Sequence, residues 1–369
     1  MRINAAVARQ PHSPFSLEEL ELSPPRQDEI LVRVVACGIC HADLIARDQD
    51  MPVPHPIVPG HESAGIVEAV GDAITDVKIG DRVVLSYLAC QRCESCLSGR
   101  PSYCSQHVPL NFRGSRTDGS VSLNAESGPV HSHFFGQSGF ATHVVATATN
   151  AVVVPADAPL ELYAPLGCGI QTGVGAVINT LRVPAGSGLA IFGAGSVGLS
   201  AVMAASATAV GTIIAVDVVP ERLELARELG ATHTINALEY EDISVPLREL
   251  TGGFGVPYAI DTSGRPETVQ QAIDGLTTTG ILGLISPGSS AATATFGLLN
   301  MVVGRTIRGI QQGDSIPSLA IPQLIEMHRQ GKLPLERIVT TFPFSEINAA
   351  VTAQERGTVV KPVLLMDQA

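Results

Sequence analysis

Four closely spaced cysteines form the strongest local signal in the sequence. They are Cys90, Cys93, Cys96 and Cys104, in the spacing C-x2-C-x2-C-x7-C. Four thiolates at such spacing can close a tetrahedron around zinc, with Zn–S distances of about 2.3 Å. Because four protein ligands leave no open coordination position, we expect this ion to be structural. Four unrelated thiols and a disulfide pair are the alternatives, and the second requires an oxidising compartment.

A second set of metal-binding residue types is scattered along the chain. Its members are Cys40, His61 and Cys168. A cysteine, a histidine and a distant cysteine can give zinc three protein ligands and an open fourth position, as in catalytic zinc sites. Sequence spacing alone does not join these three residues. Cys37 and Cys40 also form a C-x-x-C pair, but nothing around them is typical of a thioredoxin-like redox unit.

The glycine-rich sequence GAGSVG at 193–198 suggests a nucleotide site. It lies between a predicted strand at 189–193 and a predicted helix from about 196 to 209, and Asp217 ends the next predicted strand, 212–217. The glycines would let the backbone approach a pyrophosphate at the helix N-terminus. Asp217 would accept hydrogen bonds from the adenosine ribose and repel a 2′-phosphate, which favours NAD over NADP. A close-packed strand–helix turn without a ligand is the alternative.

Two patterns of elements surround these residues. Short apolar runs at 29–35, 63–70 and 81–85, separated by Gly and Pro turns, predict a barrel-like antiparallel domain. We expect 111–139 to be a long ordered loop. From Gly186 onward strands and helices alternate, which is typical of a doubly wound parallel sheet. The further elements predicted are strands at 257–261, 281–285 and 362–365 and a helix at 220–229, which begins with Pro220.

Composition excludes several classes of protein. The 369 residues fit two domains, and 45% hydrophobic against 16% charged residues excludes a disordered chain. A net charge of −12 argues against nucleic-acid binding. The uncharged run at 183–216 is interrupted by Gly and Pro, so it predicts buried strands and not a membrane span. The N-terminus lacks a hydrophobic signal core, so we expect a cytoplasmic protein with reduced cysteines.

Together these residues resemble the zinc-dependent alcohol dehydrogenases of the medium-chain dehydrogenase/reductase family, over nearly the whole chain. The motifs that carry the resemblance are CGICHAD at 37–43, PGHE at 59–62, GDRV at 80–83, the four-cysteine lobe, GCG at 167–169, GAGSVG at 193–198 and Asp217. Within the family the chain looks most like the aryl-alcohol (benzyl-alcohol) dehydrogenase branch, through stretches such as 190–205 and 306–315.

The resemblance implies an α/β protein with two domains. A Rossmann doubly wound parallel sheet that binds NAD would occupy 166–308. A mostly-β GroES-like catalytic domain would occupy 1–165 and 309–369, with a structural zinc lobe at about 86–110. A homodimer or homotetramer would form through the nucleotide-binding domain, with edge strands near 306–310 and 281–285 as the candidates.

The resemblance also assigns roles to single residues. Cys40, His61 and Cys168 would be the ligands of a catalytic zinc, which makes two zinc ions per subunit. Glu62 would lie just behind this metal, and Asp43 would orient His61. The cofactor would be contacted by His41 and Lys361 at the pyrophosphate, Thr172 at the nicotinamide, Arg222 at the adenosine ribose, and the turn residues Gly193, Gly195, Ser196, Val197, Gly198 and Asp217.

The chain departs from the family at one place that matters for mechanism. Many members carry Ser or Thr two residues after the first zinc cysteine, and some extend this proton relay with a histidine, whereas this chain has Ala42 and Ile45. Neither side chain can pass a proton. The expected activity is NAD-dependent interconversion of a primary aromatic or allylic alcohol and its aldehyde. The alternatives are a pathway-specific reductase of a natural-product aldehyde or lactol, and a non-catalytic structural protein, which the retained zinc ligands disfavour.

Overall fold

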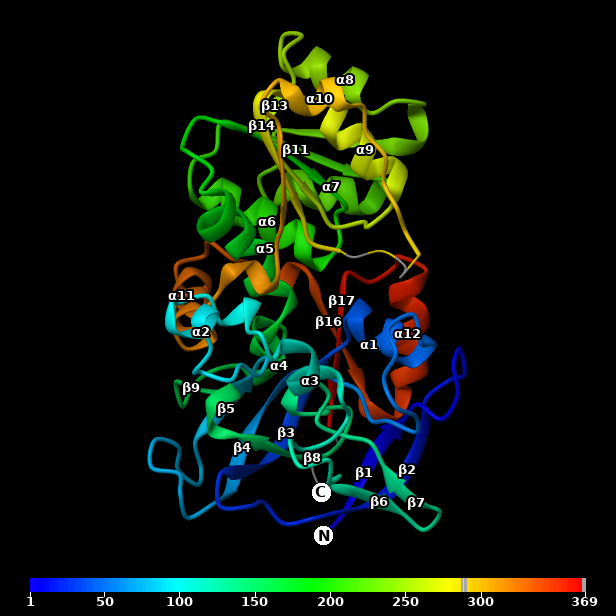
Figure 1. Cartoon of the computed structure of the whole chain (residues 1–369), viewed down its shortest axis with the longest axis vertical. Coiled ribbons are helices and arrows are strands. Elements are labelled where there is room, and N and C mark those ends of the chain that lie inside the picture. The colour runs from blue at the N-terminus through cyan, green and yellow to red at the C-terminus, as the bar shows by residue number, and fades with distance from the viewer. Residues whose placement is uncertain (287, 289–290, 367–369) are drawn as a thin grey trace. The chain divides into compact units, whose positions relative to one another are not determined.

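A computed structural model describes residues 1–286, 288 and 291–366 of the chain (Figure 1). The chain divides into two compact units. The first comprises Met1–Cys168, Ile316–Glu326 and Leu335–Ala369, and the second comprises Gly169–Ser315 and Met327–Pro334.

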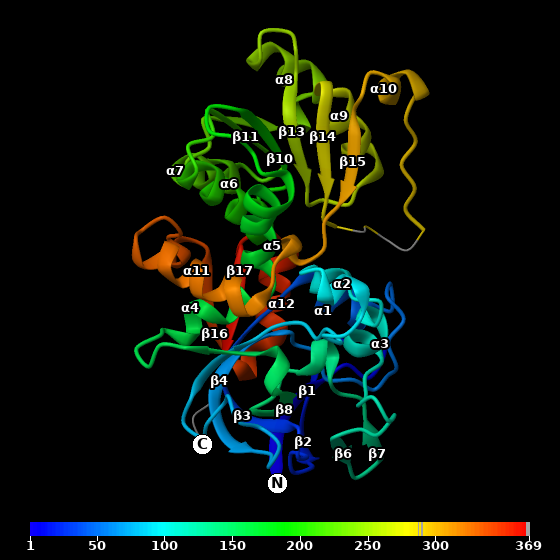
Figure 2. The same cartoon turned by 60° about the vertical axis from the view of Figure 1, so that its left-hand side comes forward.

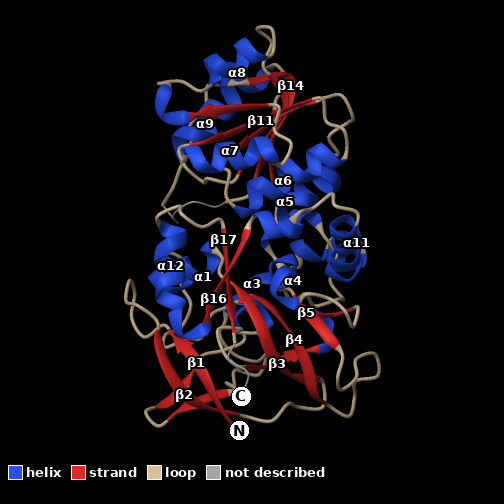
Figure 3. Cartoon of the chain, turned by 180° about the vertical axis from the view of Figure 1, so that it is seen from behind, coloured by secondary structure: helices blue, strands red, loops and turns tan. Residues whose placement is uncertain are grey.

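The first unit is built mainly from antiparallel strands (Figure 3). Its larger sheet has the order β16-β17-β3-β4-β5-β9, with β8 also paired to β3, and only the β16–β17 pair is parallel. These strands are β3 (Glu29–Gly38), β4 (Glu62–Val70), β5 (Arg82–Leu85), β8 (His143–Thr147), β9 (Ala151–Val154), β16 (Val339–Pro343) and β17 (Lys361–Leu365). The predicted strands at 29–35, 63–70, 81–85 and 362–365 all lie in this sheet.

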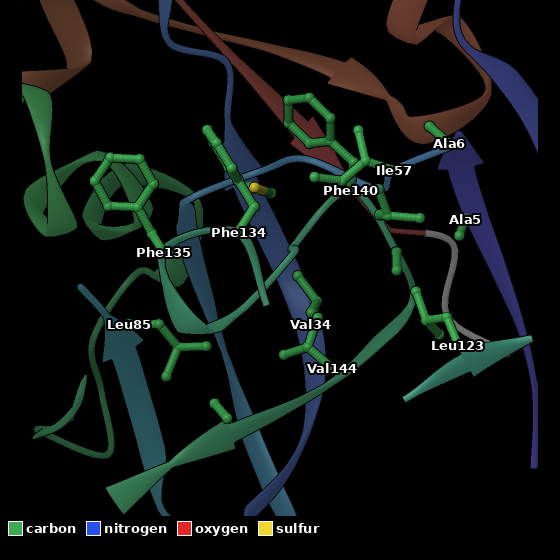
Figure 4. Close-up of a cluster of buried hydrophobic side chains, with 14 of the residues drawn as sticks. Ala5, Ala6, Val34, Ile57, Leu85, Leu123, Phe134, Phe135, Phe140 and Val144 are labelled. Atoms are coloured by element: carbon green, nitrogen blue, oxygen red, sulfur yellow. The ribbon is translucent and has the colours of Figure 1, made fainter. Parts of the chain in front are cut away.

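Residues 111–139 are not the continuous loop that we predicted. They contain β6 (Leu123–Ala125) and β7 (Gly128–Val130), a hairpin that joins β1 (Arg2–Val7) and β2 (Ser16–Leu22) in a four-stranded sheet. Three-residue strands are too short to show an alternating pattern against a polar background. Leu123 (Figure 4) nevertheless is buried in the core of this unit, and so is Val130, which anchors the hairpin.

The second unit contains a six-stranded, fully parallel sheet (Figure 2). Its order is β12-β11-β10-β13-β14-β15, which numbered within the unit is 3-2-1-4-5-6, the order of the Rossmann fold. The strands are β10 (Gly188–Phe192), β11 (Thr212–Asp217), β12 (His233–Asn236), β13 (Val256–Asp261), β14 (Leu276–Leu284) and β15 (Thr306–Gly309). The predicted α/β alternation is therefore confirmed.

The two predicted helices begin at the signals that predict them. Helix α7 (Pro220–Glu228) begins at Pro220 and is followed by Gly230, whose φ of 114° suits glycine. Helix α6 (Ser196–Ala207) begins at the glycine-rich turn. The others are α1 (His41–Asp48), α2 (Glu94–Leu97), α3 (His107–Phe112), α4 (Leu160–Tyr163), α5 (Gly169–Gly175), α8 (Ser244–Leu250), α9 (Pro266–Asp274), α10 (Leu298–Val302), α11 (Pro317–Arg329) and α12 (Ile347–Glu355). Among the described residues, none of the helices combines the length and hydrophobicity needed to span a bilayer.

Candidate metal centres and nucleotide-binding turn

The three scattered ligand candidates meet in the first unit. One ligand atom from each of Cys40, His61, Glu62 and Cys168 lies within 4.8 Å of the others. The sheet register explains half of this proximity, because Gly38 at the end of β3 pairs with Glu62 at the start of β4. Cys168 is brought in by the end of β5, where the Ser86 hydroxyl donates to the carbonyl of Gly167 at 2.6 Å. The fold thus joins residues that sequence spacing could not.

Asp43 is hydrogen-bonded to two of the ligand candidates and to the backbone between them. Its Oδ1 accepts hydrogen bonds from His61 Nδ1 at 2.8 Å and from the Gly60 amide at 2.9 Å. Its Oδ2 accepts from the Cys40 amide at 2.9 Å, and the whole side chain is buried. With Nδ1 turned to the carboxylate, His61 presents Nε2 to the sulfur atoms, 3.2 Å from Cys168 Sγ. One carboxylate therefore positions both ligand-bearing segments.

The donor set fits zinc. Two thiols and one imidazole, all turned inward and largely buried, form a Cys2His group. Such a group of sulfur and nitrogen ligands binds zinc in preference to Mg²⁺ or Ca²⁺. A hydrogen bond between the two thiols holds the pKa of Cys40 well below its usual range and raises the pKa of Cys168. Because metal ligation requires the thiolate form, a lowered pKa at Cys40 favours metal uptake.

Glu62 and Lys361 form a fully buried ion pair beside these ligands. The Lys361 ammonium donates to Glu62 Oε2 at 2.9 Å, to Oε1 at 3.2 Å and to the carbonyl of Ile39 at 3.0 Å. Glu62 therefore lies in the same group as the ligand candidates, and its charge is compensated by lysine. The contact of Lys361 with a pyrophosphate stays a prediction, and it requires the ammonium to leave these acceptors. His41 lies exposed at the start of α1, beside Cys40.

The four-cysteine lobe forms a second candidate metal centre. The sulfur–sulfur distances are 3.9 Å for Cys90–Cys96, 3.5 Å for Cys93–Cys96 and 3.9 Å for Cys93–Cys104. A zinc tetrahedron with Zn–S bonds of 2.3 Å has edges of about 3.8 Å, so the four sulfurs already have the required spacing. Hydrogen bonds from the amides of Cys96 and Ser105 lower the pKa of Cys93 to about 5. All cysteines of the chain are free thiols, so no disulfide competes.

The histidine pair His131-x-His133 does not form a metal site. Nδ1 of His131 lies 3.1 Å from the carbonyl of Gly114, and His133 is buried near the Glu29–Arg116 ion pair. Neither belongs to a cluster of metal-ligating groups within the part of the chain that the structure describes.

The glycine-rich turn in the second unit has the geometry of a nucleotide-binding fingerprint. Gly193 has a φ of 97°, and a Cβ there would clash with the Thr262 hydroxyl. A Cβ on Gly198 would clash with the carbonyl of Gly193, which keeps helix and strand close. Gly195, the N-cap of α6, instead faces open space, because no heavy atom lies within 4 Å of where its Cβ would be. Tight turn, free backbone approach and close packing are the three roles that glycines have in such a turn.

Asp217 ends β11 beside this turn. Its Oδ2 accepts from the Ala194 amide at 2.5 Å, and its Oδ1 accepts from the amides of Val218 and Val219 at 2.8 and 2.9 Å. A carboxylate offers about four acceptor positions, so one remains for a ribose hydroxyl. Arg222 lies in the first turns of α7 and Thr172 lies in α5, both within the second unit.

Fold, ligand groups and nucleotide-binding turn together define a zinc-dependent dehydrogenase, and comparison with known proteins supports this. The model of the alcohol dehydrogenase GroES-like domain matches residues 26–156, and the model of the zinc-binding dehydrogenase domain matches residues 196–328. The chain belongs to the zinc-dependent alcohol dehydrogenases of the medium-chain dehydrogenase/reductase family.

Three relatives are similar along their full length. A geraniol dehydrogenase from Castellaniella defragrans is 45% identical over 365 residues, which is 98% of this chain and 97% of that protein. The crystal structure of an alcohol dehydrogenase zinc-binding domain protein from Burkholderia ambifaria superposes with a TM-score of 0.96 at 50% identity, covering 100% of both chains. That of benzyl alcohol dehydrogenase from Acinetobacter calcoaceticus gives 0.95 at 42% identity, again covering 100% of both. The predicted family and fold are confirmed.

Two residues near His61 escaped the sequence analysis. The Phe135 ring stacks on the His61 imidazole, and the Gln137 side chain bonds to the backbone on either side of Glu62, at the His61 carbonyl and the Ser63 amide. Neither lies in a recognisable motif. Their contacts bridge segments that are far apart in the sequence, so no spacing rule could have found them.

Proposed function

We propose that the protein interconverts a primary aromatic or allylic alcohol and its aldehyde with NAD as hydride acceptor. The observation that carries the proposal is the Cys40–His61–Cys168 group, which offers three ligand atoms within 4.8 Å, with Asp43 fixing the imidazole. Zinc held there would act as a Lewis acid on the substrate oxygen, with one coordination position open. Geraniol is an allylic alcohol and benzyl alcohol an aromatic one, so the names of two relatives support the substrate class.

Residues of the chain supply the remaining requirements. Asp43 keeps the His61 ring oriented, and the Glu62–Lys361 pair keeps the carboxylate of Glu62 neutralised behind the ligands. Ala42 and Ile45 lie in α1 directly after Cys40 and offer no hydroxyl or imidazole for proton transfer. We therefore infer that the alcohol proton would leave by a route that avoids residues 42 and 45, with the exposed His41 as the chain's own candidate for its terminus.

We infer two zinc ions per subunit, one in each cysteine-containing group, and NAD in preference to NADP. Reduced thiols are needed for both ions, which supports a cytoplasmic location.

The second candidate function is reduction of a pathway-specific natural-product aldehyde or lactol on the same scaffold. Ala42 and Ile45 favour it, because they remove the usual proton relay. A screen of alcohols with NAD and of aldehydes with NADH, followed at 340 nm, separates the two. Turnover of benzyl alcohol or geraniol supports the first, and turnover in the reductive direction on complex aldehydes alone supports the second.

We also propose a homo-oligomer, a dimer or tetramer, formed through the second unit. Strand β15 has a partner only in β14, so it is an outer strand of the described sheet. The other candidate, at 281–285, lies largely in β14, which is paired on both sides. Helix α10 supports the choice of β15, because Leu298, Leu299 and Val302 are 81%, 77% and 79% exposed. An open strand edge and exposed apolar side chains each favour pairing with a second copy.

A further inference from the structure

The segment that follows His133 has an unusual backbone. His133, Phe135 and Ser138 have φ angles of 61°, 52° and 68°, and Gly136 between them has 69°. Residues with a side chain rarely adopt this left-handed region, because Cβ crowds the carbonyl oxygen. Such strain persists only where the surroundings hold it, and it concentrates at functional sites.

Polar side chains hold the segment against the start of β4, which directly follows His61. Gln137 Nε2 donates to the carbonyls of His61 at 2.9 Å and Ser86 at 3.2 Å, and its Oε1 accepts from the Ser63 amide at 3.2 Å. Asn150 Nδ2 donates to the carbonyls of Phe135 and Gly136, at 3.3 and 3.2 Å. Both amides are buried, so these bonds fix the segment relative to His61.

The strained segment presents two phenyl rings to the imidazole. The Phe135 ring stacks on His61 with centroids 4.4 Å apart and planes 21° from parallel. Phe134 meets the same imidazole edge-on, at 5.6 Å and 80°. Behind them Phe112 contacts Phe135 edge-on at 5.0 Å. Phe134 and Phe135 lie at one side of the hydrophobic core (Figure 4).

We propose that Phe135 is a positioning residue that fixes the plane of the zinc-ligating His61. The contacts of the two ring nitrogens, with Asp43 and with Cys168 Sγ, lie in the plane of the ring and do not prevent rotation of that plane about the line joining them. The parallel phenyl face opposes this rotation. An imidazole whose ring nitrogen coordinates a cation also gains positive character, and the face of an aromatic ring attracts positive charge. This inference rests on the proposed zinc site at Cys40, His61 and Cys168.

The test compares metal release from wild-type protein with that from Phe135→Leu, which keeps an apolar side chain but loses the ring. Zinc transfer to a chromogenic chelator should show two ions in the wild type. In Phe135→Leu we expect one ion to leave about 3- to 10-fold faster and the other to leave at the wild-type rate. Phe135→Tyr should restore slow release. Cobalt in place of the faster ion should show shifted d–d bands in Phe135→Leu, which a general loss of packing would not produce.

Matched variants separate positioning from packing. Phe112→Leu removes a ring that contacts Phe135 but not His61, so its release rates should equal those of the wild type. Phe135→Gly removes the ring and relieves the backbone strain, which provides a folded test protein if the leucine variant unfolds. Unchanged release and cobalt spectra in Phe135→Leu and in Phe135→Gly would overturn this inference and leave the zinc proposal standing. A wild type that holds only the four-cysteine ion would refute the zinc proposal as well.

Discussion

Asp217 allows the cofactor preference to be tested through a single charge. The carboxylate is 9% exposed and accepts hydrogen bonds from the amides of Ala194, Val218 and Val219. In the NAD proposal its remaining acceptor position binds a ribose hydroxyl, and the same oxygen would oppose the 2′-phosphate of NADP.

The magnitude follows from these two effects. A hydrogen bond to a charged acceptor contributes about 1.5–3 kcal/mol, or roughly 10- to 150-fold in kcat/KM. Two like charges about 5 Å apart repel by about 2–3 kcal/mol at an effective dielectric constant of 20 to 40. We therefore expect the unmodified enzyme to prefer NAD by at least about tenfold, even if only one of the two effects operates fully.

Two variants separate charge from structure. Asp217→Asn keeps an oxygen for the Val218 and Val219 amides and removes the charge, whereas Asp217→Ala leaves all three amides without this partner. Both should lower the ratio of kcat/KM for NAD to that for NADP by about tenfold or more. Asp217→Ala should also unfold at lower temperature than the wild type, since the buried amide of Ala194 without a partner costs about 1–3 kcal/mol. Equal use of both cofactors by the unmodified enzyme, or an unchanged ratio in Asp217→Asn, would refute the reasoning.

Four further predictions follow from the two units. Cys168→Ala should lose activity and one zinc ion with the fold retained. Cys96→Ala should lose the other zinc ion and unfold more easily, because structural zinc stabilises the folded state directly. Metal analysis and thermal melts of the two variants test both expectations. Ala42→Ser should leave alcohol oxidation unchanged or raise it modestly in steady-state assays, and a thousandfold gain on simple alcohols would favour the reductase proposal. Leu299→Glu should shift light-scattering mass toward the monomer, whereas a monomeric wild type at micromolar concentration would contradict the assembly. Burial lowers the pKa of His133 to about 4, so its neutral form stabilises the fold fully above pH 6.5, and about 2–3 kcal/mol of this stabilisation is lost as pH falls toward 4. Urea unfolding at pH 7 and pH 4.5 should therefore show a larger loss of unfolding free energy in the wild type than in His133→Asn. Equal losses in the two proteins would contradict this prediction.

Local features of the fold and site were predictable from the sequence. The turn at 193–198 and Asp217 are read from neighbouring residues, since glycine spacing and an acidic strand end act within one strand–helix unit. The lobe at Cys90–Cys104 is equally local. The start of α7 was predictable for the same reason, because Pro220 is a backbone signal that needs no distant partner.

Contacts between distant segments were not predictable from local patterns. Cys168 joins Cys40 only through the register of β3 and β4 and the bond from Ser86, and the family resemblance alone supplied this pairing. The compensation of Glu62 by Lys361 and the stack of Phe135 on His61 depend in the same way on packing across the unit. The six-stranded order, which places 281–285 inside the sheet, is likewise a property of the whole fold.

The central claim is that zinc on Cys40, His61 and Cys168 supports alcohol oxidation with NAD. The most direct measurement is NADH formation at 340 nm from benzyl alcohol and geraniol by wild-type protein and by Cys40→Ser, each with its zinc content determined. The account predicts turnover by the wild type with two zinc ions, and no turnover by Cys40→Ser with one zinc ion and an unchanged melting temperature. Turnover of these alcohols by Cys40→Ser at the wild-type rate, or a wild type with both ions that oxidises neither alcohol, would contradict it.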